Sequence, residues 1–500
     1  MSDQICTSQK ELDAYYLTQQ LEGEYPSATP EFLLETIDLV MGWAKEPESA
    51  RLRTRLQGVL VGAYPTFQEP TRQQIIKAFV SRLDGNRLAI LQDCFRVFIR
   101  HRYSPLAPRP NSKGKVLFLA RRPYFQILRE ALFLREAGFQ TTLVSMTRIP
   151  DQLQEVFSRS FDQVVRIPEH LSALPGVMER FDPDIVHIQC WMWDYALARV
   201  VLAHRGRARC VCEFYDLTSM MAERDVLASH WAPELVDLDL QSEGILCREA
   251  DAIVCRFPQE VAEELRVRHG GLTRYLEMHP YACPGLVPPG PEFTPAPDGV
   301  PRLVYAGSLV PDDGACPANL FPEIHMRSVF EALLQQGLAL DTLMDPQRPL
   351  NLETPGYNGY ATLARNYSRF NFRNGVAPDQ LARLLRGYDF GLVNLSRFDL
   401  KILQVRPSLM KNAVGTKLFT YLEAELPVIV NTEYEYMASI VSTYGLGLTV
   451  HTSMMATLPE QILAFDRAKA VANIRAFNAE HGMAQEIRRL VSLYDKLLCS

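Results

Sequence analysis

The sequence predicts an α/β protein built from two doubly wound parallel-sheet domains, with a helical extension at the N-terminus. Short apolar runs alternate with amphipathic helical segments in two series, between 116 and 257 and between 302 and 450. Runs that are apolar on both faces are typical of parallel strands that helices cover on both sides. The chain has 500 residues, too many for one hydrophobic core, which indicates at least two domains.

Proline-rich stretches separate segments of different character. Before residue 104 apolar residues recur every three to four positions, as in helices, and SPLAPRPNSKGK (104–115) interrupts this pattern. YACPGLVPPGPEFTPAPDGVP (281–301) separates the two α/β series. We therefore predict a helical N-terminal domain, two Rossmann-like domains and a C-terminal helix that crosses back to the first of them, with bounds 1–110, 111–285, 300–470 and 471–500.

Composition limits the classes of partner. The formal net charge of -6 argues against nucleic acid as the main partner, because phosphate-binding surfaces need clustered Lys and Arg. No apolar run approaches the roughly 20 residues that span a bilayer, and the polar start MSDQICTSQK lacks the apolar core of a signal peptide. We expect a cytoplasmic protein, and a peripheral association with the inner face of the membrane stays open.

The cysteines are expected to be free thiols. Cys190, Cys210, Cys212 and Cys255 lie in apolar, strand-like runs, where cysteine behaves as a small hydrophobic residue. Cys210 and Cys212 share one face of a strand, but no second Cys/His pair lies nearby to complete a zinc site. The sequence therefore predicts no metal site.

Seven segments, in this order along the chain, resemble motifs of the family 4-type glycosyltransferases of the GT-B fold. In the first half they are FDPDIVHIQC (181–190), CEFYDL (212–217) and EGILCREADAIVC (243–255), and in the second LVYAGSLVPDDG (303–314), GVAPDQLARLLRGYDFGLVNLS (375–396), GTKLFTYLEAELPVIVN (415–431) and YGLGLTV (444–450). Their shared order over roughly residues 115–495 carries the resemblance. It implies a GT-B fold and transfer of a sugar from a nucleotide-sugar donor to a glycan, lipid-linked or protein acceptor, with no cofactor besides that donor.

The chain departs from the family pattern at charged positions. The family's two glutamates, seven residues apart, fall on Asn412 and Thr420, and the arginine after the first glycine is Ser308. The lysine expected a few residues later is replaced by Asp312 or Asp313. These departures support an alternative function, a catalytically silent GT-B-like scaffold or glycan-binding protein. No motif favours an epimerase or phosphorylase.

Lys417 is the main candidate for contact with the donor diphosphate. It follows Gly415 and Thr416 at the start of a predicted helix, where its ammonium and the helix dipole meet an anion. Gly307 and Ser308 end a strand, where backbone N–H groups approach a phosphate, although a plain turn explains them almost as well. The full set of expected donor-binding residues is Gly307, Ser308, Gly375, Val376, Asn394, Ser396, Thr416 and Lys417.

Four of the expected donor-binding residues lie in the segment 375–396. The resemblance implies that Gly375 and Val376 edge the nucleotide base. Asn394 and Ser396 close an apolar strand, where polar side chains bind ribose or sugar, or act as structural caps.

Two acidic residues are the catalytic candidates. Asp216 follows a strand and either orients or deprotonates the acceptor, or caps the next helix. Glu423 lies three residues after Thr420 on the same side of a helix, so it either contacts a sugar hydroxyl or is exposed on the surface.

Arginines and tryptophans in the first half are candidates for acceptor binding. Arg121 and Arg122 follow the first strand and predict an anionic acceptor, because two guanidinium groups held in a cleft without an anion would repel each other. A solvated pair is the alternative. Trp191 and Trp193 either stack on a sugar face or pack internally. His187, inside an apolar strand, is expected to be a core histidine.

Overall fold

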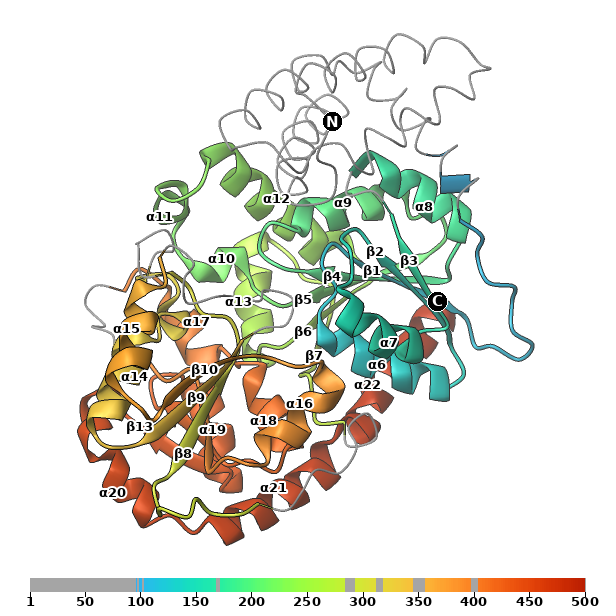
Figure 1. Ribbon diagram of the computed structural model, residues 1–500. Coiled ribbons are helices and arrows are strands. Elements are labelled where there is room, and N and C mark those ends of the chain that lie inside the picture. Colours follow the sequence, from blue (N-terminus) through green and yellow to red (C-terminus); the bar gives the residue numbers. More distant parts are fainter. Residues whose placement is uncertain are drawn as a thin grey trace, which may run out of the picture.

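The structure is a computed structural model, shown in Figure 1. It describes residues 103–167, 171–283, 293–311, 318–344, 356–396 and 403–499, together with residues 96, 99 and 100. Most of the predicted N-terminal helical domain, and Asp312 and Asp313, lie outside the described residues.

Two fully parallel sheets form the centres of two α/β domains, which confirms the predicted fold class. The first sheet has the order β3-β2-β1-β4-β5-β6-β7 and the second β10-β9-β8-β11-β12-β13. The strands of the first are β1 (Lys115–Ala120), β2 (Gln140–Ser145), β3 (Gln163–Arg166), β4 (Ile185–Cys190), β5 (Arg209–Phe214), β6 (Ala252–Cys255) and β7 (Arg274–Glu277). Those of the second are β8 (Arg302–Ala306), β9 (Ala339–Met344), β10 (Phe370–Asn374), β11 (Phe390–Val393), β12 (Val428–Asn431) and β13 (Gly447–Val450).

Helices connect the strands and cover both faces of each sheet (Figure 1). Those of the first domain are α6 (Phe125–Glu136), α7 (Asp151–Ser160), α8 (Leu174–Phe181), α9 (Tyr195–His204), α10 (Thr218–Met221), α11 (Arg224–Ala228), α12 (Pro233–Glu249) and α13 (Glu260–His269), with the 3-10 helix η1 (Leu171–Ala173). Those that follow are α14 (Arg327–Gln335), α15 (Asn358–Asn366), α16 (Pro378–Leu385), α17 (Pro407–Asn412), α18 (Lys417–Glu423), α19 (Glu435–Tyr444), α20 (Leu458–Leu463), α21 (Arg467–His481) and α22 (Met483–Cys499), with η2 (Pro322–Ile324) and η3 (Thr452–Thr457).

Strands β7, β9 and β10 were not predicted, because polar residues interrupt their apolar pattern. In β9 the carboxylate of Asp341 faces inward and accepts hydrogen bonds from Tyr388 Oη (2.7 Å) and Asn371 Nδ2 (2.8 Å). These partners, distant in sequence, offset the cost of burying the carboxylate. The strand is thus stabilised by contacts that no local pattern reveals.

The C-terminal helix leaves the second domain and packs on the first. Helix α21 runs along the second domain, and α22 lies against α6 (Figure 1). Tyr494 of α22 is fully buried and its hydroxyl lies 2.5 Å from Nδ1 of His187 in β4. His187 is therefore a core histidine, as expected, and its partner comes from the opposite end of the chain.

A buried ion pair joins the two domains and holds the segment between them. Arg129 of α6 donates to Glu423 Oε2 of α18 (2.6 Å) and to the carbonyl oxygens of Pro280 and Tyr281. The other oxygen, Glu423 Oε1, accepts the backbone N–H of Cys283 (2.6 Å). We call these residues the interdomain clamp. Both charges are buried and fully paired, as buried charges must be.

The contacts of Glu423 in the clamp contradict both interpretations from the sequence, a surface residue and a contact to a sugar hydroxyl. Glu423 is only 7% exposed, so it is not a surface residue. Its two carboxylate oxygens are occupied by Arg129 and by the Cys283 N–H, so they are not directed at a sugar hydroxyl beside Thr420. We therefore assign Glu423 to the domain interface and no longer regard it as a catalytic candidate.

We expect Glu423→Gln to lower the free energy of unfolding by about 3–5 kcal/mol, because it leaves the Arg129 charge buried without a counter-charge. Urea titration of the wild type and the variant measures the loss. The matched control is Asp379→Asn, which breaks the exposed interdomain pair Arg159–Asp379 (2.9 Å) and should cost less than about 1 kcal/mol. Equal losses in the two variants would contradict the role assigned to the clamp.

Candidate functional site

The points where the strand order reverses in the two sheets face each other. In doubly wound sheets ligands bind at this point, beyond the carboxyl ends of the strands. The reversal lies between β1 and β4 in the first sheet and between β8 and β11 in the second. Tyr124, which follows β1, donates its N–H to Gln189 Oε1 on β4 (3.0 Å), and its hydroxyl lies 2.9 Å from Thr416 Oγ1, which precedes α18. One tyrosine thus connects the two reversal points.

Tyr421 bridges β8 and β11 where the two strands separate. We call the region beyond the carboxyl ends of these strands, where doubly wound sheets bind ligands, the crevice. The two strands pair only at Phe390–Leu303 and Gly391–Val304. Beyond this point the Tyr421 hydroxyl accepts the N–H of Ala306 (2.7 Å) and takes the place of the next rung of the ladder. A Cβ on Gly391 would lie 2.5 Å from the Tyr421 ring, so only glycine leaves space for it.

Lys417 lies over Gly307 in this crevice. A Cβ on Gly307 would come within 2.2 Å of Lys417 Cε, so the lysine side chain occupies the space that the glycine leaves. The ammonium lies 5.0 Å from the centre of the Tyr305 ring, in cation–π range. Helix α18 has only seven residues. Lys417 is its first residue, so the ammonium group belongs to the N-terminus of this helix, as the sequence predicted.

Charged residues of both domains converge near Lys417. Asp216, beyond β5, accepts from Arg256 Nη2 (2.6 Å), and its side chain does not cap α10. Across the interface, burial raises the pKa of the Glu323 carboxyl in η2, and the charge of Asp216 raises it further. The charges of Lys417 and Arg256 lower that pKa. Sequence reasoning missed Glu323 and Arg256, because Glu323 is in no recognised motif and Arg256 only flanks one.

The other predicted donor-binding residues lie along the same edge of the second sheet, since all its strands are parallel. Asn394 follows β11 with φ of 44°, and a Cβ on Gly415 would come within 2.6 Å of its Oδ1. Gly375 and Val376 are half-buried and lie between β10 and α16. Ser308 also lies at this edge, where its carbonyl accepts from Tyr305 Oη (2.9 Å).

Ser396 is buried, and both its backbone N–H and its carbonyl are hydrogen-bonded. It is 1% exposed, and its N–H donates to Asn431 Oδ1 at 2.5 Å. Its carbonyl accepts from Thr452 Oγ1 at 3.2 Å. These backbone bonds tie the end of β11 to Asn431 at the end of β12 and to Thr452 after β13. The role of the Ser396 hydroxyl stays a prediction.

The two tryptophans belong to different aromatic groups. Trp191, after β4, stacks on Tyr215 with ring centres 4.5 Å apart, and Tyr124 meets Trp191 edge-on at 5.1 Å. Trp193 instead packs against Trp231 at 5.2 Å, and its backbone N–H donates to Asp239 Oδ2 (3.0 Å). The half-buried Trp191 therefore lies beside the residue that bridges the reversal points, whereas Trp193 is part of another cluster.

Arg121 has an anionic partner within the protein. It is largely buried and forms an ion pair with Asp194 at 3.6 Å. This corrects the premise that Arg121 and Arg122 need an external anion, because Asp194 already offsets one of the two charges. Arg122 is exposed, and its carbonyl accepts from Gln189 Nε2 (3.4 Å).

Among the described residues, one group of three side chains could hold a metal ion, whereas the sequence predicted none. It consists of Glu130, His187 and Glu213, which lie inside the first domain between α6 and the sheet. No helix in the described part of the chain is both long and apolar enough to cross a membrane.

Comparison with known proteins finds a family match for the second domain. Residues 340–480 match the family described as "Glucosyltransferase 3-like, C-terminal domain". A search of curated proteins finds no match. Sucrose-phosphate synthase from Thermosynechococcus elongatus is similar in structure, with a TM-score of 0.51 at 16% identity, over 77% of this chain and 99% of that one.

Two other solved structures are more distant. HepE of Anabaena in complex with UDP-glucose has a TM-score of 0.49 at 12% identity, over 77% of this chain and 98% of its own. The O-GlcNAc transferase of Thermobaculum terrenum has a TM-score of 0.46 at 14% identity, over 94% and 84%. At these identities the likeness concerns the fold. The chain has the GT-B fold, and its second domain carries the match to the glucosyltransferase 3-like family.

Proposed function

We propose that the chain is a glycosyltransferase that transfers a sugar, of the hexosyl class, from a nucleotide-sugar donor to a glycan, lipid-linked or protein acceptor. The observation that carries the proposal is the position of Lys417 over Gly307, in the crevice where the strand order of the second sheet reverses. The family match of residues 340–480 supports it, since β11, α18 and β12 lie within that segment. The order of the sequence motifs favours a family 4-like enzyme, and a cytoplasmic location stays the expectation from the sequence.

Lys417 suits the charge that develops during transfer. The reaction breaks the bond between the anomeric carbon and the diphosphate, and the negative charge of the leaving group grows as this bond breaks. An ammonium held in place before the reaction stabilises this charge without reorganisation. The backbone N–H of Ser308 approaches the phosphates, whereas the Gly307 N–H already donates to the Leu343 carbonyl (2.9 Å). The turn at Gly375 and Val376 receives the base, and Asn394 receives the ribose or sugar.

The first domain supplies the acceptor side. The stack of Trp191 on Tyr215 offers an apolar surface for a sugar ring. Asp216, oriented by Arg256, accepts the proton of the attacking hydroxyl. Tyr124 keeps this side aligned with the donor side through Thr416.

A panel of UDP-, GDP-, ADP- and CMP-sugars should contain at least one ligand that raises the thermal unfolding midpoint, because a ligand bound to the native state stabilises it. Lys417→Ala should weaken binding of that ligand about 10- to 100-fold, the effect of losing a charge-assisted hydrogen bond. Lys411→Ala, at an exposed lysine of α17, is the control and should bind like the wild type. If no nucleotide sugar binds the wild type, the scaffold alternative replaces this proposal.

Gly307→Ala should reproduce the loss seen for Lys417→Ala although it removes no charge. The added Cβ would lie 2.2 Å from Lys417 Cε and displace the lysine from the crevice. Gly387→Ala is the matched control, since its Cβ would meet no atom closer than 3.6 Å. Calorimetric titration with the ligand from the panel measures both variants. Wild-type affinity in Gly307→Ala would show that the position of Lys417 is not needed for donor binding.

An anionic acceptor stays a prediction that depends on Arg122. If the acceptor carries a phosphate or carboxylate, Arg122→Ala should raise its KM several-fold and flatten the dependence of KM on salt, because one screened ion pair is lost. The control is Arg207→Ala, which removes an exposed charge just before β5, at the opposite edge of the sheet. Equal effects on anionic and neutral acceptor analogues would rule out the contact.

A further inference from the structure

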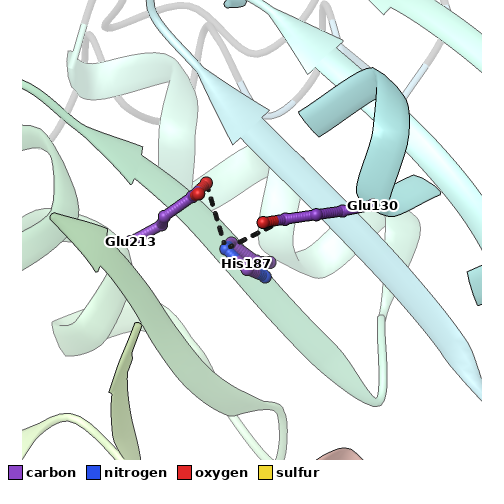
Figure 2. Close-up of side chains that lie close together, drawn as sticks. All are labelled: Glu130, His187 and Glu213. Atoms are coloured by element: carbon purple, nitrogen blue, oxygen red, sulfur yellow. Dashed lines mark ion pairs between the residues drawn. The ribbon is translucent and has the colours of Figure 1, made fainter. Parts of the chain in front are cut away.

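Glu130, His187 and Glu213 come together inside the first domain (Figure 2). They lie on three elements, α6, β4 and β5, and their side chains are 0–2% exposed. His187 Nε2 lies 3.4 Å from Glu213 Oε2 and 3.9 Å from Glu130 Oε2. The one ligand atom that each residue offers lies within 4.8 Å of the other two.

Each of the three side chains is held at one atom and unsatisfied at the other. Gln126 Nε2 donates to Oε1 of both Glu130 and Glu213, and Tyr494 Oη lies 2.5 Å from His187 Nδ1. The remaining atoms, Oε2 of each carboxylate and Nε2 of the histidine, are buried without a hydrogen-bond partner. Leaving such atoms unpaired in a dry interior is costly, so their convergence on one point requires an explanation.

We propose that Glu130, His187 and Glu213 bind a divalent transition-metal ion, of which zinc fits best, in the interior of the first domain. Imidazole nitrogen and carboxylate oxygen are both zinc ligands, with bonds of about 2.0–2.2 Å. In a tetrahedral site such bonds put neighbouring ligand atoms about 3.3–3.6 Å apart. The Nε2–Oε2 separations of 3.4 and 3.9 Å are close to this range, and a water completes the four ligands.

The surrounding contacts orient the ligands toward the ion. Zinc-bound histidines normally donate their other ring N–H to a polar partner, which fixes the tautomer. Here Tyr494 Oη lies 2.5 Å from Nδ1, so with the ion bound Nδ1 would donate its N–H to this oxygen and the lone pair of Nε2 would face the carboxylates. Gln126 turns both carboxylates the same way through their Oε1 atoms. Phe118 stacks on the imidazole at 5.0 Å and keeps the ring in place.

The competing explanation is a proton held between the two carboxyls. Burial raises the pKa of Glu213 to about 8 and raises that of Glu130, and the coulombic effect of Glu213 raises the Glu130 pKa further. Tyr215 and Tyr494 are the other titratable groups that face the cluster. A carboxyl with a raised folded pKa stabilises the fold at low pH, and this stability is lost as pH rises toward 8. Metal binding needs deprotonated ligands and so strengthens as pH rises.

The experiment measures metal in the full-length chain, purified without chelator or a histidine tag, by mass spectrometry of the elements. We expect about one zinc per chain, lost at least tenfold in Glu213→Gln and Glu130→Gln. The matched control is Glu243→Gln, which alters another buried carboxylate bound to a histidine, His269 (2.9 Å), and to the Ser219 N–H (3.1 Å). This control should retain its zinc.

A second measurement on the wild type decides the case even if a variant fails to fold. Metal-free chain titrated with Co²⁺ should give the visible absorption of a four-coordinate ion, and the rise of its unfolding midpoint with Zn²⁺ should grow between pH 6 and 8. Absence of stoichiometric metal together with no Co²⁺ spectrum would overturn the proposal, leaving the shared proton. Metal retained in both Glu130→Gln and Glu213→Gln would place it elsewhere and equally overturn it.

Discussion

The arrangement of the two domains depends on one buried ion pair, Arg129–Glu423. Each charge has its counter-charge only in the other domain, so separating the domains would leave both charges without a partner. Glu423 ends the short helix that Lys417 begins, and Tyr421 of the same helix accepts a hydrogen bond from the end of β8. The clamp therefore sets the position of the proposed donor lysine relative to the first domain. Through Pro280, Tyr281 and Cys283 it also fixes the segment that leads out of that domain.

Helix α6 links this interface to the interior of the first domain. Neighbouring residues of α6 serve different partners, since Arg129 reaches the second domain and Glu130 points at His187 under the sheet. His187 in turn contacts Tyr494 of the C-terminal helix. A rigid Glu130–His187–Glu213 group would hold α6, β4, β5 and α22 together, and with them the helix from which Arg129 acts.

The sequence predicted those features that depend on the local pattern of apolar and polar residues. The apolar runs predicted the two parallel sheets. The glycine and polar residues that follow the strands predicted a ligand-binding edge of the second sheet, and Gly307 and Lys417 do come together there. What it could not predict depends on pairs far apart in the chain. Glu423 looked exposed because its partner Arg129 is on another domain, and Arg121 looked unpaired because Asp194 follows a different strand. The carboxylates around His187 come from separate elements, so no spacing revealed them.

The structure of the two domains also bears on the departures from the family motif. The motif's missing arginine, at Ser308, removes a positive charge from the donor side of the crevice. Arg256 provides one from the first domain, and together with Lys417 it acts on Glu323. Two cations and two carboxylates, Asp216 and Glu323, then share the interface between the reversal points. Arg256 is already paired with Asp216 (2.6 Å), so it replaces the motif arginine only in part, and the proposal relies mainly on Lys417 for the charge that meets a diphosphate.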